Sequence, residues 1–348
     1  MDARRKRQHL KHPRIEIEAG KRTAGELLED MAETAFQGRK MGEAFAVWKQ
    51  MLSERNTTVF MGLAGAMVPA GMGRLISFLI ERRGIDVLVT TGAALSHDLY
   101  QALGRHHYMG TPQVDDDELQ KLRIDRVYDT YTDEDGLYAA DKWIMRTLPE
   151  LLDDHTPYST REIVEVIGRE VNKMKHGRGS LLATAYRSKL PIFVPAFGDS
   201  SIGFALMFAN RKRKRNIVVD MMRDVDQTCQ ITERAGKTGV VLIGGGVPKN
   251  YIQQTAVVAG YETDKEMMHK FGVSITTDSP QWGGLSGCTF DESKSWGKYD
   301  VNAVFATCYA DATIALPMLV NGLAEWKGLK NRKPPRFDWS GKRLKLTY

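Results

Sequence analysis

A lysine close to a tryptophan is the strongest candidate for covalent chemistry in this sequence. Lys298 ends the segment Asp291-Glu292-Ser293-Lys294-Ser295-Trp296-Gly297-Lys298. An apolar wall beside an amine disfavours its charged form and lowers its pKa, and the neutral amine can form a Schiff base. The acids upstream would attract a cation. The same residues also suit an ordinary lysine on an amphipathic turn, so the spacing alone leaves both interpretations open.

Glycines and small polar residues form a second group of candidates, because they follow apolar runs that are typical of buried strands. In open α/β sheets, ligands bind outside the carboxyl ends of the strands. Backbone N–H groups at such turns bind phosphate and carboxylates bind ribose hydroxyl groups, so the group predicts a nucleotide site. Each turn by itself also fits an ordinary strand-to-helix connection. The candidates are Thr91, Asp199, Gly244, Gly245, Gly246, Thr277, Ser286, Ala310 and Asp311.

The elements that must position these residues alternate along the chain. Apolar, β-branched runs are separated by turns and helical stretches, and continuous apolar runs are typical of parallel strands covered on both faces. The sequence therefore predicts an α/β fold with a doubly wound parallel sheet. The expected strands are residues 59–62, 86–91, 192–195, 217–220, 240–243, 273–276 and 303–306.

The pattern divides the chain into three parts. Residues 1–55 carry a basic arm and two predicted helices, residues 56–330 form the α/β domain, and residues 331–348 are a C-terminal tail. The segment Ser159-Thr160-Arg161-Glu162 is a capping box, which predicts a helix start. Residues 105–160 are the least regular part, and they would be an insertion or a mobile cover.

Composition excludes several classes of protein. The 348 residues carry 49 Lys and Arg against 43 Asp and Glu, and only three cysteines, which is too few for a disulfide scaffold. The N-terminus has no apolar signal region, and no window is apolar for long enough to span a membrane. We therefore expect a cytoplasmic protein without membrane contact.

Two basic clusters, at residues 4–7 and 211–215, raise the question of nucleic-acid binding. Neither has interleaved aromatic residues, and the second lies where an exposed loop is expected, so binding of nucleic acid is not predicted. A metal site is not predicted either, because the sequence has neither Cys-x-x-Cys nor His-Glu-x-x-His spacing.

Taken together, the motifs resemble the deoxyhypusine synthase family. Ser295-Trp296-Gly297-Lys298, with Ser286-Gly287 and Glu292 before it and Tyr309-Ala310-Asp311-Ala312 after it, carries the resemblance, which covers about residues 55–325. The segment from Gln281 to Cys288 is similar to the bacterial deoxyhypusine-synthase-like branch. The resemblance implies a Rossmann-like parallel sheet, a homotetramer, and active sites shared between subunits.

The resemblance also implies a mechanism. NAD takes a hydride from the carbon beside an amine nitrogen, Lys298 captures the butyl group as an imine, and an acceptor amine then receives the group and the hydride. Trp296 would stack along the aliphatic chain, and Glu292 would pair with an ammonium. By position, the family's NAD contacts fall on Thr91, Asp199, Thr277, Ser286, Ala310 and Asp311.

The chain departs from the family pattern at the substrate. Where the family places two further acids and a histidine against spermidine, this sequence has Phe204, Leu285 and Asn250. A family Glu is replaced by His97, and an Asn and a Ser on the NAD side are replaced by Ala66 and Pro69. Loss of carboxylates facing an ammonium disfavours that cation.

The departures favour a free amine as the acceptor. The candidate reaction is condensation of two diamines, as in homospermidine formation, or of two agmatines. Trp282 would stack on a guanidinium, and Asp278 and Glu292 would supply negative charge. Two alternatives remain open: transfer from spermidine to a protein lysine of a translation factor, and a non-catalytic family member that acts as a binding protein.

Overall fold

The core of the protein is a six-stranded sheet in which every strand pairs in parallel with its neighbours. The structure is a computed structural model that describes residues 10, 13–261, 265, 267–340 and 343–348, so the basic cluster at residues 4–7 lies outside the described residues. All the strands end at the same edge. In order across the sheet they are β6 (Ile192–Phe193), β2 (Val87–Thr90), β1 (Thr57–Leu63), β7 (Lys237–Ile243), β8 (His269–Thr276) and β9 (Tyr299–Tyr309).

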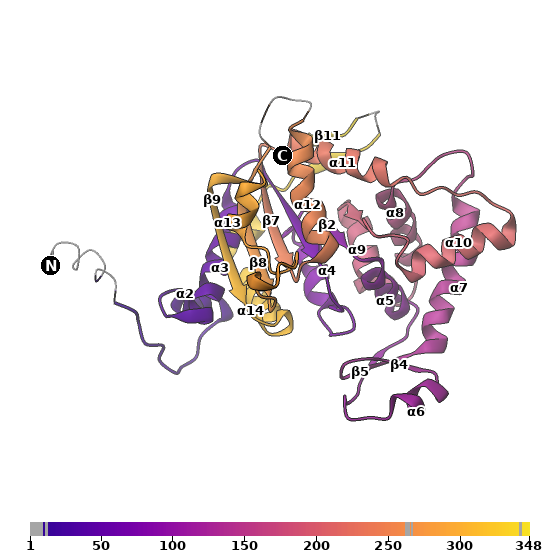
Figure 1. The fold of residues 1–348 in the computed structure, drawn as a ribbon, viewed down its shortest axis with the longest axis horizontal. Coiled ribbons are helices and arrows are strands. Elements are labelled where there is room, and N and C mark those ends of the chain that lie inside the picture. Colours follow the sequence, from indigo (N-terminus) through magenta and orange to yellow (C-terminus); the bar gives the residue numbers. More distant parts are fainter. Residues whose placement is uncertain (1–9, 11–12, 262–264, 266, 341–342) are drawn as a thin grey trace.

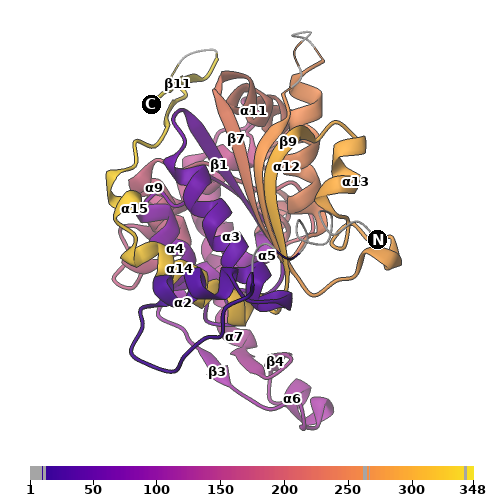
Figure 2. The ribbon, with the colours of Figure 1, turned by 90° about the vertical axis from the view of Figure 1, so that its left-hand side faces the viewer.

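Helices cover both faces of this sheet, as Figure 2 shows edge-on. The inner strands are buried because apolar side chains point into a core on each side, whereas the edge strand β9 is exposed or half-buried over its central residues. One face carries α3 (Phe36–Ser53), α4 (Gly73–Glu81) and α14 (Ala312–Glu325), with α2 (Ala24–Ala32) and α15 (Lys327–Asn331) beside them. The other face carries α11 (Met221–Arg234), α12 (Gly246–Ala259) and α13 (Phe290–Ser295). The predicted doubly wound α/β fold is confirmed.

A second group of helices lies beyond the β6 edge of the sheet (Figure 1). A small antiparallel sheet extends from this group at one end of the molecule, so residues 105–160 contain an ordered projection. The helices are α5 (Gly92–Ala102), α7 (Glu134–Leu151), α8 (Thr160–Val171), α9 (Leu181–Ser188) and α10 (Ser201–Arg213). The small sheet contains β3 (His107–Met109), β5 (Thr130–Asp133) and β4 (Ile124–Val127), joined by α6 (Asp116–Lys121).

Most local predictions are confirmed. Ser159 caps α8 in the expected box with Glu162, and residues 24–53 form two helices. The predicted strand at residues 217–220 is wrong: Val219 makes only an isolated bridge to Tyr158, outside the main sheet. A short β-branched run is extended in both situations, so its pattern cannot distinguish a sheet strand from a single bridge.

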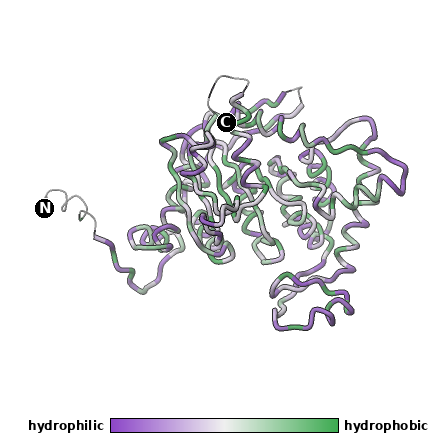
Figure 3. Tube along the Cα trace, viewed as in Figure 1, coloured by the Kyte–Doolittle hydropathy of each residue, from purple (hydrophilic) through white to green (hydrophobic). Residues whose placement is uncertain are grey.

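The structure of the basic residues 211–215 also differs from the exposed loop that the sequence predicts. The helix α10 continues to Arg213 instead of ending in a loop, because cations in the last turn of a helix are stabilised by its dipole. Arg213 pairs with Glu150, and Arg215 lies 2.6 Å from Asp154. Figure 3 shows the outer end of α10 as hydrophilic. These cations are therefore partly neutralised by their own chain.

The N-terminal helices and the C-terminal tail pack against the α/β domain. The helix α3 contacts β8 and β9, and the tail forms a hairpin of β10 (Arg336–Asp338) and β11 (Lys345–Thr347). The division at residues 55 and 330 stays a prediction. No helix in the described part of the chain has the length and apolar character needed to cross a membrane.

Candidate active site at Lys298

The segment that presents Lys298 is built by the end of α13. Thr289 caps the start of this helix by accepting a hydrogen bond from the Glu292 N–H at 3.0 Å. The helix ends in a Schellman motif: Gly297 N–H donates to Lys294 O at 2.9 Å, and Lys298 N–H donates to Ser293 O at 3.2 Å. Gly297 has a φ of 69°, which a residue with a side chain rarely adopts. The Trp-Gly-Lys order is therefore a helix stop that places Lys298 directly before β9.

The side chain of Lys298 is buried and faces α12. Only 7% of the residue is exposed, and its Nζ donates to Asn250 Oδ1 at 3.1 Å. The Nζ atom also lies 5.9 Å from the centre of the Trp296 ring. Burial lowers the pKa of Lys298, and the negative charge of the Glu292 carboxylate opposes this effect. The amine of Lys298 therefore loses its proton at a lower pH than the amine of an exposed lysine does.

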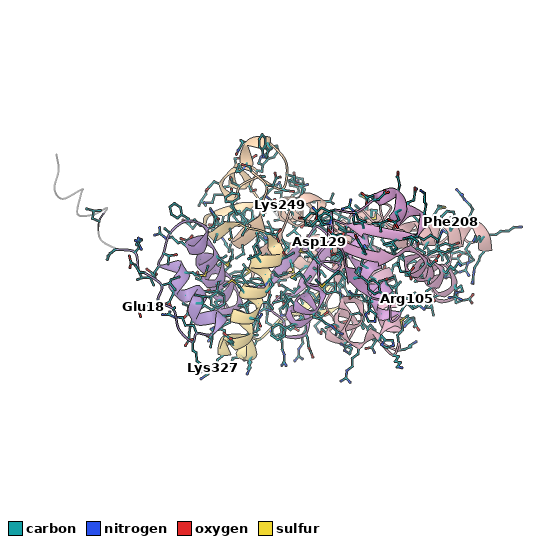
Figure 4. The ribbon with its side chains drawn as sticks, turned by 90° about the horizontal axis from the view of Figure 1, so that it is seen from below. Glu18, Arg105, Asp129, Phe208, Lys249 and Lys327 are labelled. Carbon is teal, nitrogen blue, oxygen red and sulfur yellow. The ribbon has the colours of Figure 1, made fainter. Side chains whose placement is uncertain are left out.

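A second buried lysine, which sequence analysis did not select, holds the loop beside Lys298. Lys249 is 2% exposed, and its Nζ donates to the carbonyl oxygens of Ser286 and Cys288 at 3.3 and 2.6 Å. Burial lowers the pKa of Lys249, and the charge of nearby Lys298 acts in the same direction. The sequence signal that could have identified Lys249 is its position directly before Asn250, in the first turns of α12. Figure 4 labels this residue.

The glycine turn between β7 and α12 fits a phosphate-bearing cofactor. Gly244 and Gly246 have φ values of 71° and 59°, and a Cβ added to Gly245 would lie 2.4 Å from the Cα of Ser286. Ser286 Oγ accepts from the Gly246 N–H at 3.2 Å. The N-cap residue Gly245 has no side chain that could cap α12, so the N–H groups and the dipole at the start of this helix suit an anion.

The other predicted cofactor residues lie after the strands, at the same edge as this turn. Thr91 and Asp311 also serve as N-caps, of α5 and α14. Asp199 and Thr277 are exposed, and Ala310 is half-buried. Since parallel strands bring these positions to one edge, the set fits a dinucleotide, with carboxylates for ribose and a glycine turn for phosphate.

The predicted substrate residues are only partly brought together. Asn250 and Trp296 contact Lys298, and Glu292 acts on it electrostatically from an exposed position. Asp278 is half-buried, and it acts through its charge on Lys249. Trp282, in the short 3-10 helix η2 (Pro280–Trp282), is 74% exposed and makes no ring or cation contact within the described chain.

The positions at which this chain departs from the family pattern form no acidic cluster in the described structure. Phe204 and Leu285, which the resemblance predicts to replace acids, are both exposed apolar side chains. His97 Nδ1 lies 3.0 Å from His107 Nε2, and burial lowers the pKa of both imidazoles, that of His107 to about 4. In the described residues, no group of three or more His, Cys, Asp or Glu side chains is placed to hold a metal.

Comparison with known proteins identifies the family. The family model described as deoxyhypusine synthase matches residues 26–323. The chain belongs to the deoxyhypusine synthase family. Members of this family are NAD-dependent transferases, so the chain is an enzyme of the alkyl-transferring class.

Relatives come from archaea and from bacteria. The protein named "Probable deoxyhypusine synthase 2" of Methanosarcina mazei is 46% identical over 338 residues, covering 97% of each chain. The "Deoxyhypusine synthase-like protein" of Elusimicrobium minutum is 36% identical and is covered over 82% of its length, against 88% of this chain. A crystal structure assigned as a deoxyhypusine synthase of Entamoeba histolytica shares the fold, with a TM-score of 0.63 and 19% identity, over 87% of this chain and 95% of that one.

Proposed function

We propose that this deoxyhypusine synthase family member is an NAD-dependent transferase that moves an aminobutyl or guanidinobutyl group onto a free amine through an imine on Lys298. The observation that carries the proposal is the buried Lys298 amine, with lowered pKa, hydrogen-bonded to the neutral side chain of Asn250. A neutral partner leaves the amine free to lose its proton, which covalent capture requires.

NAD would be held by the edge of the sheet at the carboxyl ends of the strands. The turn Gly244-Gly245-Gly246 and Ser286 would bind phosphate, and Asp199 and Asp311 would bind ribose hydroxyl groups, with Thr91, Thr277 and Ala310 lining the same edge. When bound, NAD supplies a hydride acceptor for the carbon beside the donor nitrogen and later returns the hydride.

The chain's own groups perform the transfer between these two events. The neutral Lys298 amine attacks the oxidised carbon, a C–N bond to lysine forms, and the donor's original nitrogen leaves as an amine or as ammonia. The acceptor amine then attacks the same carbon and releases Lys298. Asn250 holds the amine by accepting its hydrogen bond, and Trp296 covers it. Glu292 supplies the charge for an ammonium or guanidinium.

The substrate surface favours small free amines over spermidine. Phe204 and Leu285 supply no carboxylate for the ammonium groups of spermidine. The flat ring of Trp282 suits a guanidinium, for which Asp278 and Glu292 would provide the charge, so we place agmatine condensation beside homospermidine-type condensation of diamines.

Completion of the site by a second subunit is part of the proposal. Trp296, beside the buried Lys298, is 67% exposed and Trp282 is 74% exposed, and such large apolar side chains are typical of a surface that a partner covers. We propose a homotetramer in the cytoplasm, with sites shared between subunits.

The experiment is an adduct measurement with one donor at a time. The full-length protein is incubated with NAD and spermidine, putrescine or agmatine, borohydride is added to reduce any imine, and the intact mass is measured. We expect an aminobutyl or guanidinobutyl increment that peptide mapping assigns to Lys298, and no increment with Lys298→Arg. A sample that binds NAD but gives no adduct with any donor would contradict the imine mechanism.

The alternative with a protein acceptor has its own supporting observation, since the archaeal relatives at about 46% identity are named deoxyhypusine synthases. The same experiment separates the two functions. Before borohydride is added, while the group is held on Lys298 as an imine, a free diamine or agmatine is added in one sample, and an archaeal translation factor with its acceptor lysine in another. Release of the adduct by the small amine alone supports our proposal, and transfer only to the protein supports the alternative.

A further inference from the structure

A basic cavity lies away from Lys298, among the helices beyond the β6 edge and α4. It is bounded by the start of α4, the end of α5, the 3-10 helix η1 (Gly177–Gly179) and the side of α9, and its volume is about 900 Å³. Figure 4 labels Arg105, from its wall, in a different part of the molecule from Lys249 of the candidate active site. The volume falls in the range of sites for small organic ligands.

The charges on the cavity wall are almost all positive. The lining includes one carboxylate, that of Glu81, and two imidazoles, those of His106 and His176. Like charges in one concave surface repel each other and raise the local positive potential, which an anion relieves. The cationic lining residues are Arg74, Arg105, Lys175, Arg178 and Arg187.

Most of these cations have no carboxylate partner. Among the described residues, Arg74, Lys175, Arg178 and Arg187 take part in no ion pair, whereas Arg105 lies 3.3 Å from Asp133. Arg187 instead donates to two neutral side chains and to the Arg178 carbonyl. Arg74 also interacts electrostatically with the buried Asp98, whose carboxylate accepts hydrogen bonds from the Leu181 and Leu182 N–H groups, and the wall still keeps an excess of positive charge.

The backbone is shaped around Arg74. A Cβ added to Gly179 would lie 1.1 Å from Arg74 Nη1, so glycine at this position makes room for the guanidinium. Ser77 Oγ donates to Gly179 O at 3.2 Å, which ties η1 to α4 beside the same guanidinium. Arg74 thus lies against a fixed strip of backbone at the cavity wall.

The beginning of α4 adds to the positive potential. Its residues Gly73 and Arg74 line the cavity, its N-cap residue Met72 supplies no side-chain hydrogen bond, and its first turn contains no acid. The N–H groups and the dipole at the start of a helix favour an anion. This feature coincides with the cluster of unpaired guanidinium groups.

We propose that this cavity binds a small polyphosphate anion, with the phosphate chain held by Arg74 and Arg178 against the start of α4. Guanidinium forks match phosphate oxygens in pairs, which explains the number of arginines in the wall. Val68 and Phe78 supply an apolar part of the lining, which suits a base attached to the phosphates. A nucleoside triphosphate and inorganic triphosphate share the recognised chemistry.

The test is a binding titration of the full-length protein by calorimetry with ATP and, separately, inorganic triphosphate, at physiological salt. We expect a saturable site per chain that weakens as salt is raised. Arg74→Gln and Arg178→Gln should each weaken binding by about tenfold or more. Gly179→Ala should act like Arg74→Gln because it displaces the guanidinium. Arg82→Gln, an exposed arginine of α4's C-terminal end outside the cavity lining, is the charge-matched control and should leave binding unchanged.

Each outcome decides the inference. Equal binding of both ligands supports recognition of the phosphate chain alone, and preference for ATP supports a contact with the base. The inference is overturned if neither ligand binds, or if Arg82→Gln weakens binding as much as the cavity variants. In a competition titration, it is also overturned if NAD displaces the ligand stoichiometrically, since the cavity would then be the cofactor's own phosphate site. Arg74 and Arg178 are exposed, so their substitution leaves the core unchanged.

Discussion

The hydrogen bond from Lys298 Nζ to Asn250 Oδ1, at 3.1 Å, sets the charge of the candidate nucleophile. Burial lowers the pKa of Lys298, and a neutral amide does not counteract it as a carboxylate would. We therefore expect Asn250→Asp to raise the pKa of Lys298 and to slow formation of the borohydride-trapped adduct about tenfold or more near neutral pH. The rate of adduct formation, measured from pH 7 to pH 10, should recover toward that of the unmodified protein as the pH rises.

The matched control is Asn250→Gln, which keeps a neutral amide and adds a methylene group. It should lower the rate without moving its pH dependence. If Asn250→Asp and Asn250→Gln give the same pH profile, the charge at this position does not govern Lys298, and the role we assign to the neutral partner is wrong.

A separate prediction concerns Lys249, because its amine holds the loop that contains Ser286 and Cys288. Its removal would leave the Ser286 and Cys288 carbonyl oxygens without their buried donor, at about 1–3 kcal/mol for each unsatisfied group. We expect Lys249→Met to lower the free energy of unfolding and to weaken NAD binding, because Ser286 also accepts from Gly246 N–H. Denaturant titration and NAD calorimetry measure the two effects.

Lys270→Met, which removes a half-exposed lysine of β8 paired with Asp300, is the control for loss of a lysine charge. It should change both quantities little, since an exposed ion pair contributes about 0–1 kcal/mol. An unaltered NAD affinity in Lys249→Met would show that the loop does not need this anchor.

At the level of the elements, the end of α13 depends on one backbone conformation. Gly297 has a φ of 69° and nothing within 4 Å of an added Cβ, so Gly297→Ala meets backbone strain alone, about 1–2 kcal/mol. We expect Gly297→Ala to lower the free energy of unfolding by this amount and to slow adduct formation on Lys298. Both effects should be smaller in Gly297→Asn. Gly71→Ala is matched, with a φ of 84° and open space, and should cost similar stability without slowing the adduct. Equal adduct rates in Gly297→Ala and Gly71→Ala would contradict the positioning role of this helix stop.

The elements also explain what the sequence could predict. Continuous apolar strands such as residues 240–243 can be recognised because they are buried on both faces, whereas the small sheet of β3, β5 and β4 is half-buried or exposed at nearly every residue and has no such pattern. The motif pointed to Lys298, but the contact with Asn250 joins residues 48 apart and depends on packing of α12 beside the start of β9. Lys249 was missed for the same reason, since its partners lie in a loop 37 and 39 residues further on.

For the whole molecule, a histidine in the core links stability to pH. His269 is fully buried between strands and α12, where its Nδ1 accepts from Thr238 Oγ1 at 2.8 Å and its Nε2 donates to Ile252 O at 3.3 Å. Burial lowers its pKa to about 4, against about 6.5 in the unfolded chain. Between these values the unfolded chain binds more protons, so the contribution of His269 to stability is complete above about pH 6.5 and is lost as the pH falls toward 4.

Other buried groups act in the opposite direction, so the test is a difference between two proteins. Burial raises the pKa of Asp98 and Asp224 to about 6, and these carboxyl groups stabilise the fold increasingly as the pH falls through that range. They are present in both the unmodified protein and His269→Gln, and their effect cancels in the comparison. We expect the free energy of unfolding of the unmodified protein, relative to His269→Gln, to fall by about 3 kcal/mol from pH 6.5 to pH 4, measured by urea titration. A difference that does not vary with pH would mean that His269 can take up a proton in the folded core, and the neutral, doubly hydrogen-bonded imidazole assigned here would be wrong.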